Sequence, residues 1–150
     1  MGQSLVKNYL HIVFSTKHRQ PFIQQRFESQ LYSYIAGICN RLECTPLQVG
    51  GHLDHVHIAC RLSQKIALMK LLEEVKSHSS KWFKTVDRSL ENFFWQDGYG
   101  AFSVNPHQIE NVIKYIRNQH AHHNKIGFQT EFRGYLKKYN MEYDEKYVWD

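Results

Sequence analysis

Residues 50–61, GGHLDHVHIACR, combine a glycine turn, a strand and two closely spaced histidines. From residue 55 onward apolar and polar positions alternate, as they do on a strand with one buried face. His55 and His57 therefore share a face and lie about 6.7 Å apart along the strand. Two imidazoles at this spacing can bind one divalent ion and leave coordination positions open, as catalytic sites do. The simpler interpretation is a half-polar strand in a chain that is rich in histidine.

The composition predicts a single globular domain over residues 1–150, long enough to bury a hydrophobic core. The net charge is +5 and the isoelectric point is near 9.1. This mildly basic balance fits a polyanionic partner without establishing one. Nine Tyr, nine Phe and three Trp could stack on unpaired bases, or they could build an ordinary core.

The cysteine pattern bears on the compartment. Three cysteines are present and none forms a C-x-x-C pair, so a reduced, cytoplasmic chain is the simplest expectation. The apolar run within residues 1–17 is too short and too polar for a signal peptide or a membrane span.

Hydrophobic periodicity predicts elements in the order β-α-β-β-α-β, followed by further helices. The expected strands are residues 9–15, 46–50, 55–62 and 93–104, the last as a strand or hairpin; the expected helices are residues 22–42, 65–86, 106–122 and 130–139. This order is typical of the α+β, ferredoxin-like or RRM-like split βαββαβ fold with an antiparallel sheet. In that fold the first and third strands are central neighbours, and the first two helices cover one face.

This arrangement assigns the two histidines to the open face of the sheet. Six apolar positions on the central strands would face the two helices: Leu10, Ile12, Phe14, Val56, Ile58 and Cys60. His55 and His57 would point the other way, together with His11 or its neighbours. The helix expected at residues 106–122 is available to cover them.

That helix carries a second set of chemically useful side chains. Tyr115 and Gln119 lie four residues apart, so we expect them on one edge of the helix. The first offers a phenol, and the second offers an amide oxygen that a hard cation accepts. Together they could bring a nucleophile and a third metal ligand to the histidine face. Without the histidine pair, a boundary tyrosine and a solvated glutamine would be the better interpretation.

These motifs together resemble a known family. The His55-Val56-His57 strand, followed by a helix with Tyr115-Ile116-Arg117-Asn118-Gln119, resembles the single-tyrosine HUH transposases, the TnpA-like enzymes of small bacterial insertion sequences. Residues 9–19, YLHIVFSTKHR, look like that family's first strand and basic loop, and residues 95–104, WQDGYGAFSV, look like its segment before the tyrosine helix. The resemblance extends over nearly the whole chain.

The resemblance implies a DNA transposase that cleaves and rejoins single-stranded DNA at the ends of an insertion sequence. It implies Tyr115 as the nucleophile, a 5′-phosphotyrosine intermediate, and a divalent ion bound by His55, His57 and Gln119. Magnesium is the expected ion, with Mn²⁺ as a substitute. It further implies a homodimer that recognises hairpins, in which the tyrosine helix of one subunit can complete the other's site. The setting would be the cytosol of a bacterium or archaeon, in association with the nucleoid. No ATP is expected, and the chain has no G-x-x-x-x-G-K-[ST] loop.

Several site assignments remain open in the sequence. Any of three nearby histidines could replace Gln119 as the third ligand: His120, His122 and His123. Tyr135 and Tyr139 are four residues apart, as the nucleophiles of two-tyrosine HUH enzymes are, but we interpret them as packing or DNA-facing aromatics. Charge and placement alone suggest four phosphate contacts: Lys17, Arg19, Lys81 and Lys84.

Other functions compete with this one. A replication initiator or relaxase would usually carry added domains, whereas a related enzyme acting on repetitive palindromic elements would differ only in its DNA. An RRM-like RNA binder would need aromatics where His55 and His57 stand. A metal-dependent hydrolase would use water in place of Tyr115 as the nucleophile.

Overall fold

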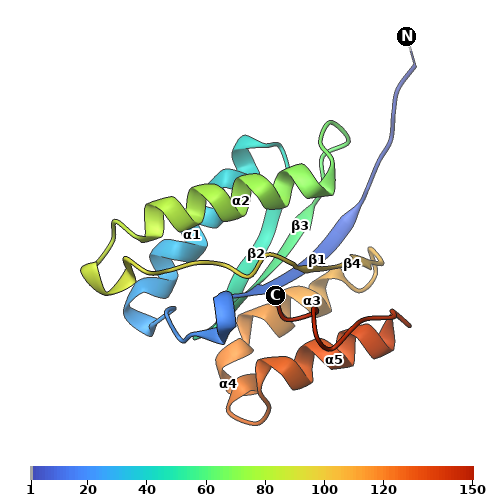
Figure 1. Ribbon diagram of the computed structural model, residues 1–150. Helices are drawn as coiled ribbons and strands as arrows, with labels where there is room; N and C mark the ends of the chain where they lie inside the picture. Colours follow the sequence, from blue (N-terminus) through green and yellow to red (C-terminus); the bar gives the residue numbers. More distant parts are fainter. Residues whose placement is uncertain (1) are drawn as a thin grey trace.

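The computed structural model describes residues 2–150 and forms one antiparallel sheet with helices on both faces (Figure 1). The sequence order of elements is confirmed. The strands are β1 (Tyr9–Ser15), β2 (Thr45–His52), β3 (His55–Arg61) and β4 (Gly100–Val104); the α-helices are α1 (Gln25–Arg41), α2 (Leu68–Phe83), α3 (Ile109–Arg117), α4 (Gln119–His123) and α5 (Phe128–Lys138); two short 3₁₀ turns are η1 (Lys17–Arg19) and η2 (Arg88–Leu90).

The sheet has the strand order β2-β3-β1-β4, with antiparallel pairing between all neighbours. This is the expected split βαββαβ fold, with β1 and β3 at the centre. The register places Val13 opposite His57 and Ser15 opposite His55. Because successive side chains alternate between faces, this register fixes which residues of β1 accompany the histidines.

The main hydrophobic core lies between the sheet and the helices α1 and α2 (Figure 1). The six apolar positions expected on this face are all buried there: Leu10, Ile12, Phe14, Val56, Ile58 and Cys60. Burying one such large apolar side chain contributes roughly 1.5–3 kcal/mol. This core therefore fixes the sheet, and the sheet in turn fixes the face that the histidines share.

The opposite face is covered by α3, α4 and α5 (Figure 1). Two glycines allow these helices to approach closely. A Cβ atom at Gly50 would lie 2.9 Å from Cγ2 and from the carbonyl oxygen of Ile116, and one at Gly100 would lie 2.7 Å from the ring of Phe132. A side chain at either position would push α3 or α5 away from the sheet.

Several expected boundaries were wrong. The helix expected to begin at Pro106 begins at Ile109, because residues 105–108 form a separate turn, in which the Gln108 amide donates to the Asn105 carbonyl at 2.8 Å and the His107 amide donates to Asn105 Oδ1. The helix also breaks at Asn118, whose φ of −99° and ψ of 21° are not helical, so Tyr115 and Gln119 lie on two helices. The fourth strand covers only Gly100–Val104, and upstream of it the chain makes a single bridge between Trp95 and Thr16.

The other helices are shorter or shifted relative to the sequence expectation. Helix α1 begins after Gln24, α2 begins after Ala67 and ends before Lys84, and α5 begins two residues earlier than expected, after Gly127. In the opposite direction, β2 is longer than expected and continues to His52, so only Leu53 and Asp54 form the turn to β3.

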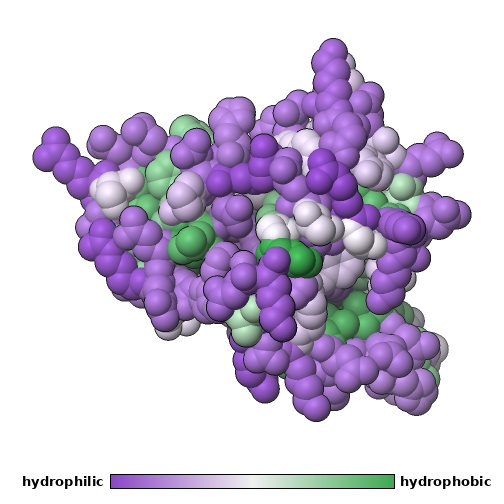
Figure 2. Space-filling model, turned by 90° about the horizontal axis from the view of Figure 1, so that it is seen from below, coloured by the Kyte–Doolittle hydropathy of each residue, from purple (hydrophilic) through white to green (hydrophobic). Residues whose placement is uncertain are grey.

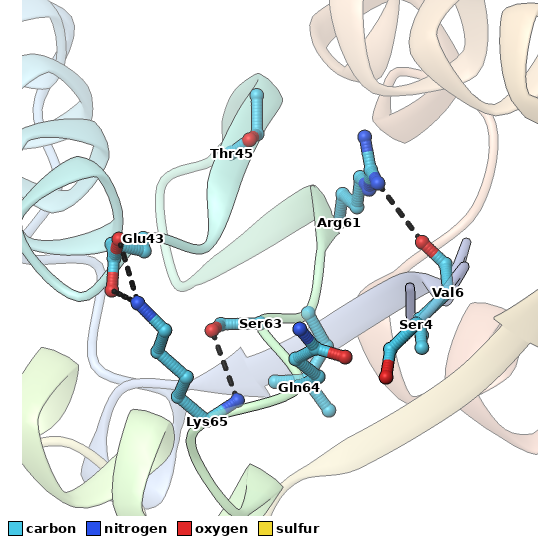
Figure 3. A pocket seen from close by; sticks show the side chains of 9 residues that line it. Ser4, Val6, Glu43, Thr45, Arg61, Ser63, Gln64 and Lys65 are labelled. Atoms are coloured by element: carbon cyan, nitrogen blue, oxygen red, sulfur yellow. Dashed lines mark hydrogen bonds and ion pairs between the residues drawn. The ribbon is translucent and has the colours of Figure 1, made fainter. Parts of the chain in front are cut away.

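The surface is largely hydrophilic when seen from below the view of Figure 1, with separate small hydrophobic patches (Figure 2). A hollow of about 250 Å³ lies near Arg61, at the end of β3 away from His55. Glu43 and Lys65 form an ion pair of 3.2 Å in its wall, and Arg61 donates to the Val6 carbonyl (Figure 3).

Among residues 2–150, no helix has the length and apolar character needed to cross a membrane.

Candidate active site

The centre of the site is formed by His55 and His57 on β3. Both side chains are fully buried, on the face covered by α3, α4 and α5, and their ring centroids are 5.0 Å apart. The Nδ1 atom of each ring has a hydrogen-bond partner. His55 Nδ1 lies 2.8 Å from an Asp54 carboxylate oxygen, and His57 Nδ1 lies 2.8 Å from His11 Nε2. The Nε2 atoms of both rings are therefore directed toward the same space.

Two further groups bring ligand atoms to this space. The side chains of His55, His57, His123 and Glu131 each offer one ligand atom, and these four atoms all lie within 4.8 Å of one another. Glu131 Oε1 is 3.0 Å from His57 Nε2 and 3.5 Å from His55 Nε2. Three imidazoles and a carboxylate form a donor set that could hold a divalent metal ion.

Gln119 faces the same space. Its amide oxygen is 3.0 Å from His55 Nε2 and 2.9 Å from His123 Nε2, and its amide nitrogen donates to Glu131 Oε2 at 3.2 Å. The sequence expectation thus placed this side chain close to the histidines, although the helix break at Asn118 had not been foreseen.

The tautomers of the histidines show how well this cluster fits a cation. His55 Nδ1–H donates to Asp54, and His123 Nδ1–H donates to the Ile126 carbonyl at 2.8 Å. Their Nε2 lone pairs then face the amide oxygen of Gln119 and the carboxylate of Glu131. Both sides of these contacts are hydrogen-bond acceptors, so they repel one another. A bound cation, or protonation of the rings, resolves that repulsion, and outer partners of this kind are typical of metal-bound histidines.

Tyr115 reaches the same cluster from α3. Its hydroxyl donates a hydrogen bond to Glu131 Oε2 and lies 2.9 Å from His122 Nε2. Its ring centroid is 5.9 Å from that of His57 in the same chain. The Tyr115 side chain is only partly buried, and the Glu131 carboxylate holds its hydroxyl.

The charges follow from these contacts. Burial would raise the pKa of the Glu131 carboxyl, but the neighbouring His123 and His57 rings outweigh burial and hold that pKa well below its usual range. Burial lowers the pKa of His57 to about 4. Burial and the bond to Glu131 raise the pKa of the Tyr115 hydroxyl above its ordinary value. An ionised carboxylate therefore stands beside a protonated phenol and accepts its hydrogen bond.

The three histidines considered as alternative ligands lie in different surroundings. His123 is in the cluster. His122 contacts Tyr115 and Glu131. His120 points away from the centre, with Nδ1 2.7 Å from His52 Nδ1 and Nε2 2.8 Å from Glu28.

The sequence interpretation missed Glu131. It lies on α5, 74 residues after His57, and only the folding of α5 onto β4 brings it to the site. In the sequence, the signal was an acid at an apolar position of this helix, three residues after Phe128 and four before Tyr135. The glutamate side chain is 2% exposed and faces the cluster with both oxygens.

The four candidate phosphate contacts are divided between two regions. Lys17 and Arg19 lie on η1, at the end of the sheet that carries His55, where the Thr16 amide donates to the Asp54 carbonyl at 2.8 Å. Lys81 and Lys84 belong to the end of α2, on the opposite face of the sheet from Tyr115. Lys81 and Lys84 therefore do not lie near the histidine cluster.

The two other tyrosines pack beside the site. The rings of Tyr135 and Tyr139 both stack on Phe102, with centroid distances of 5.2 and 4.9 Å. Tyr135 also contacts His11 edge to face at 5.2 Å, and its ring is 6.2 Å from that of Tyr115.

Comparison with known proteins agrees with this fold. A family model described as IS200-like transposase matches residues 4–119. The chain therefore belongs to the IS200-like transposase family, a class of DNA-processing enzymes. The suspected relationship to single-tyrosine transposases is confirmed at the level of the family. No curated protein sequence matches the chain.

Two solved structures show the same fold at low sequence identity. One is described as a putative transposase from Deinococcus radiodurans R1. It has a TM-score of 0.63 and 17% sequence identity, and the match covers 79% of this chain and 96% of that chain. The other is a REP-associated tyrosine transposase bound to a REP hairpin, with a TM-score of 0.60 and 13% identity over 84% of this chain and 74% of that one.

Proposed function

We propose that the protein cleaves and rejoins single-stranded DNA at the ends of a mobile element, with Tyr115 as the nucleophile. The observation that carries this proposal is the chain of contacts from Tyr115 through Glu131 to His57, within one subunit. It joins a phenol, an ionised carboxylate and a cluster able to hold a metal at one place on the sheet. A nucleic-acid binder of the RRM type has no need of such a cluster.

In the proposed reaction the Tyr115 oxygen attacks the phosphorus of a phosphodiester while its proton passes to Glu131 Oε2. The bond between phosphorus and the 3′-oxygen breaks, and that oxygen leaves as a free 3′-OH by taking a proton from solvent, to which Glu131 releases the phenol proton. The 5′-phosphate remains on the tyrosine. Attack by a 3′-OH reverses these steps and joins strands, so the bond energy is conserved and no ATP is consumed.

We propose that His55, His57, His123 and Glu131 hold a divalent ion, with the amide oxygen of Gln119 as a further ligand. Such an ion supplies Lewis-acid polarisation of the phosphoryl oxygens and places the scissile phosphate. Either magnesium or manganese could serve. The imidazole-rich donor set favours Mn²⁺ in affinity, because Mg²⁺ prefers oxygen ligands.

The proposed substrate is DNA with a hairpin next to the cleaved strand. One of the structurally similar transposases is bound to a REP hairpin, which supports hairpin recognition here. Lys17 and Arg19 are the proposed phosphate contacts, because they lie at the His55 end of the sheet and remain partly or fully exposed. Lys81 and Lys84 would contact only DNA that wraps around the other face.

The experiment that tests this function is incubation of labelled single-stranded hairpin DNA with protein and Mg²⁺ or Mn²⁺, followed by a denaturing gel. A covalent protein–DNA band in the wild type, absent in Tyr115→Phe, supports the proposal. Cleaved product with a free 5′-phosphate and no covalent band would favour a hydrolase, and no cleavage of any strand would argue for a binding protein.

We further propose that each subunit carries a complete site, whether or not the protein is a homodimer. Mixing His57→Ala protein with Tyr115→Phe protein tests this. No covalent adduct is expected from the mixture, because neither chain retains both groups. Recovered adduct would show that the tyrosine of one subunit serves the histidines of another.

A further inference from the structure

A cleft of about 870 Å³ opens between α3 and α5, and Tyr115 and Glu131 form part of its wall. Its volume falls within the roughly 300–1,000 Å³ that is typical of small-ligand sites. A DNA strand with a phosphate against Tyr115 would have this cleft directly beside it. Its lining outside the cluster has no role in the chemistry proposed above.

Two amide side chains of the α3 region line the cleft. Asn111 Nδ2 donates a hydrogen bond of 2.9 Å to Gln108 Oε1. This bond leaves the side-chain oxygen of Asn111 and the side-chain amide hydrogens of Gln108 available to a ligand. An acceptor beside a donor is the pattern that a nucleobase edge requires. Asn111 precedes Tyr115 by four residues, so both side chains lie on the same face of the helix.

An aromatic ring and a cation stand across the cleft on α5 and after it. Tyr139 stacks on Phe102, and its hydroxyl donates to the Ser103 carbonyl at 3.1 Å, which fixes the ring at the edge of β4. The ring is partly exposed and lines the cleft, so a base can stack on it. Lys138, the neighbouring residue, is an exposed cation suited to a phosphate.

Gly134 adds an independent observation. It lies in the middle of α5, where glycine is less favourable than alanine, and it lines the cleft. A Cβ atom there would meet nothing within 4 Å, so no packing within the chain requires glycine. What its missing side chain does is leave room in the cleft.

We propose that this cleft holds one unpaired nucleotide next to the phosphate that Tyr115 attacks, and that the Gln108–Asn111 pair reads the edge of its base. The base stacks on Tyr139, and Gly134 leaves space for the sugar. This inference rests on the proposed function and adds that the protein itself selects a base beside the cleaved bond.

The first test uses a library of single-stranded oligonucleotides that carry a hairpin with randomised nucleotides on both sides. Covalent adducts are isolated under denaturing conditions, and the bound and released strands are sequenced. The wild type should prefer one base by about tenfold or more at a position next to the cleaved bond. Asn111→Leu should lose that preference while still forming adducts, and the control Asn40→Leu, an exposed asparagine of α1, should keep it.

The second test fills the cleft. Gly134→Leu should lower the rate of adduct formation at least tenfold, and an abasic site at the selected position should restore part of the rate by vacating space. The matched control is Gly37→Leu, because Gly37 is also an exposed helix glycine whose Cβ would meet nothing, but on α1. Circular dichroism melts are the check that both variants are folded.

Two results would overturn the inference while leaving the proposed function intact. One is an unchanged base preference in Asn111→Leu, or no preference in the wild type at either neighbouring position. The other is equal adduct rates for Gly134→Leu and Gly37→Leu. Absence of any adduct with wild-type protein would instead remove the proposed function, and this inference with it.

Discussion

The hydroxyl of Tyr115 donates a hydrogen bond to Glu131, and the same carboxylate accepts one from His57 at 3.0 Å. One side chain thus contacts both the candidate nucleophile and the candidate metal ligands. Its two oxygens divide these tasks, with Oε1 toward His55 and His57 and Oε2 toward Tyr115 and His122. The position of Glu131 therefore links proton removal from the phenol to the metal cluster.

Glu131→Gln should lower the rate of adduct formation by about 10²- to 10⁴-fold, which is the usual contribution of a positioned base. The amide is nearly the same size but cannot take the phenol proton. Single-turnover kinetics at saturating Mn²⁺ measure this effect. Glu110→Gln, an exposed change on α3, is the control, and equal rates for the two variants would exclude Glu131 from the reaction.

Replacement of neighbouring histidines should separate metal ligands from other residues. His123→Ala should weaken Mn²⁺ binding at least about tenfold, since even outer partners of metal ligands typically contribute this much. His120→Ala should leave the affinity nearly unchanged, because His120 faces His52 and Glu28 instead of the cluster. Isothermal titration with Mn²⁺ measures both. The reverse order would mean that His120 is the ligand.

Gly50→Ala should destabilise the protein by about 1–3 kcal/mol, because the new Cβ would lie 2.9 Å from Ile116 and force α3 away from β2. Since α3 carries Tyr115, the rate of adduct formation should fall as well. Gly37→Ala, where the Cβ has open space, should be neutral or slightly stabilising. Urea unfolding measures the free energies. A neutral Gly50→Ala would show that α3 is not held tightly on the sheet.

Acidification should destabilise the metal-free protein. Burial lowers the pKa of His57 to about 4, so the folded state binds fewer protons than the unfolded state, whose histidine titrates near 6.5. The stability associated with His57 is fully present above pH 6.5 and is lost as the pH falls toward 4, by up to ~3 kcal/mol. Glu131 acts in the same direction at lower pH, because its pKa is also depressed.

Urea unfolding in EDTA between pH 7.5 and 4.5 measures this dependence. His57→Gln keeps a polar side chain that does not titrate, so its unfolding free energy should change less over the same range. An equal slope for the wild type and the variant would show that His57 is not buried in its neutral form.

The fold could be predicted in detail because local signals agree with it. Alternating residues on the central strands and helical periodicity on residues 22–42 each specify one buried face, and their order permits few topologies. The same alternation placed His55 and His57 on the open face. The ends of elements were less predictable, since Asn105 forms a turn and Asn118 interrupts a helix for reasons of local hydrogen bonding.

The site could be predicted only where its residues lie close in sequence. The two histidines and the spacing of Tyr115 and Gln119 carry periodic information. Glu131 shows only as an acid at an apolar position of its helix, and the packing of α5 onto Gly100 and β4 is what brings it to the cluster. His123 could be named only as one of three alternatives, since the break at Asn118 changes which side of the chain faces the sheet.

In the proposed reaction Tyr115 becomes covalently attached to a DNA 5′-phosphate. The most direct measurement is proteolysis of the isolated protein–DNA adduct after nuclease trimming, followed by tandem mass spectrometry of the modified peptide. We expect a nucleotide on Tyr115, and the same assay applied to Tyr135→Phe protein should still find it there. Attachment at Tyr135 or Tyr139, or an adduct that persists in Tyr115→Phe, would contradict it.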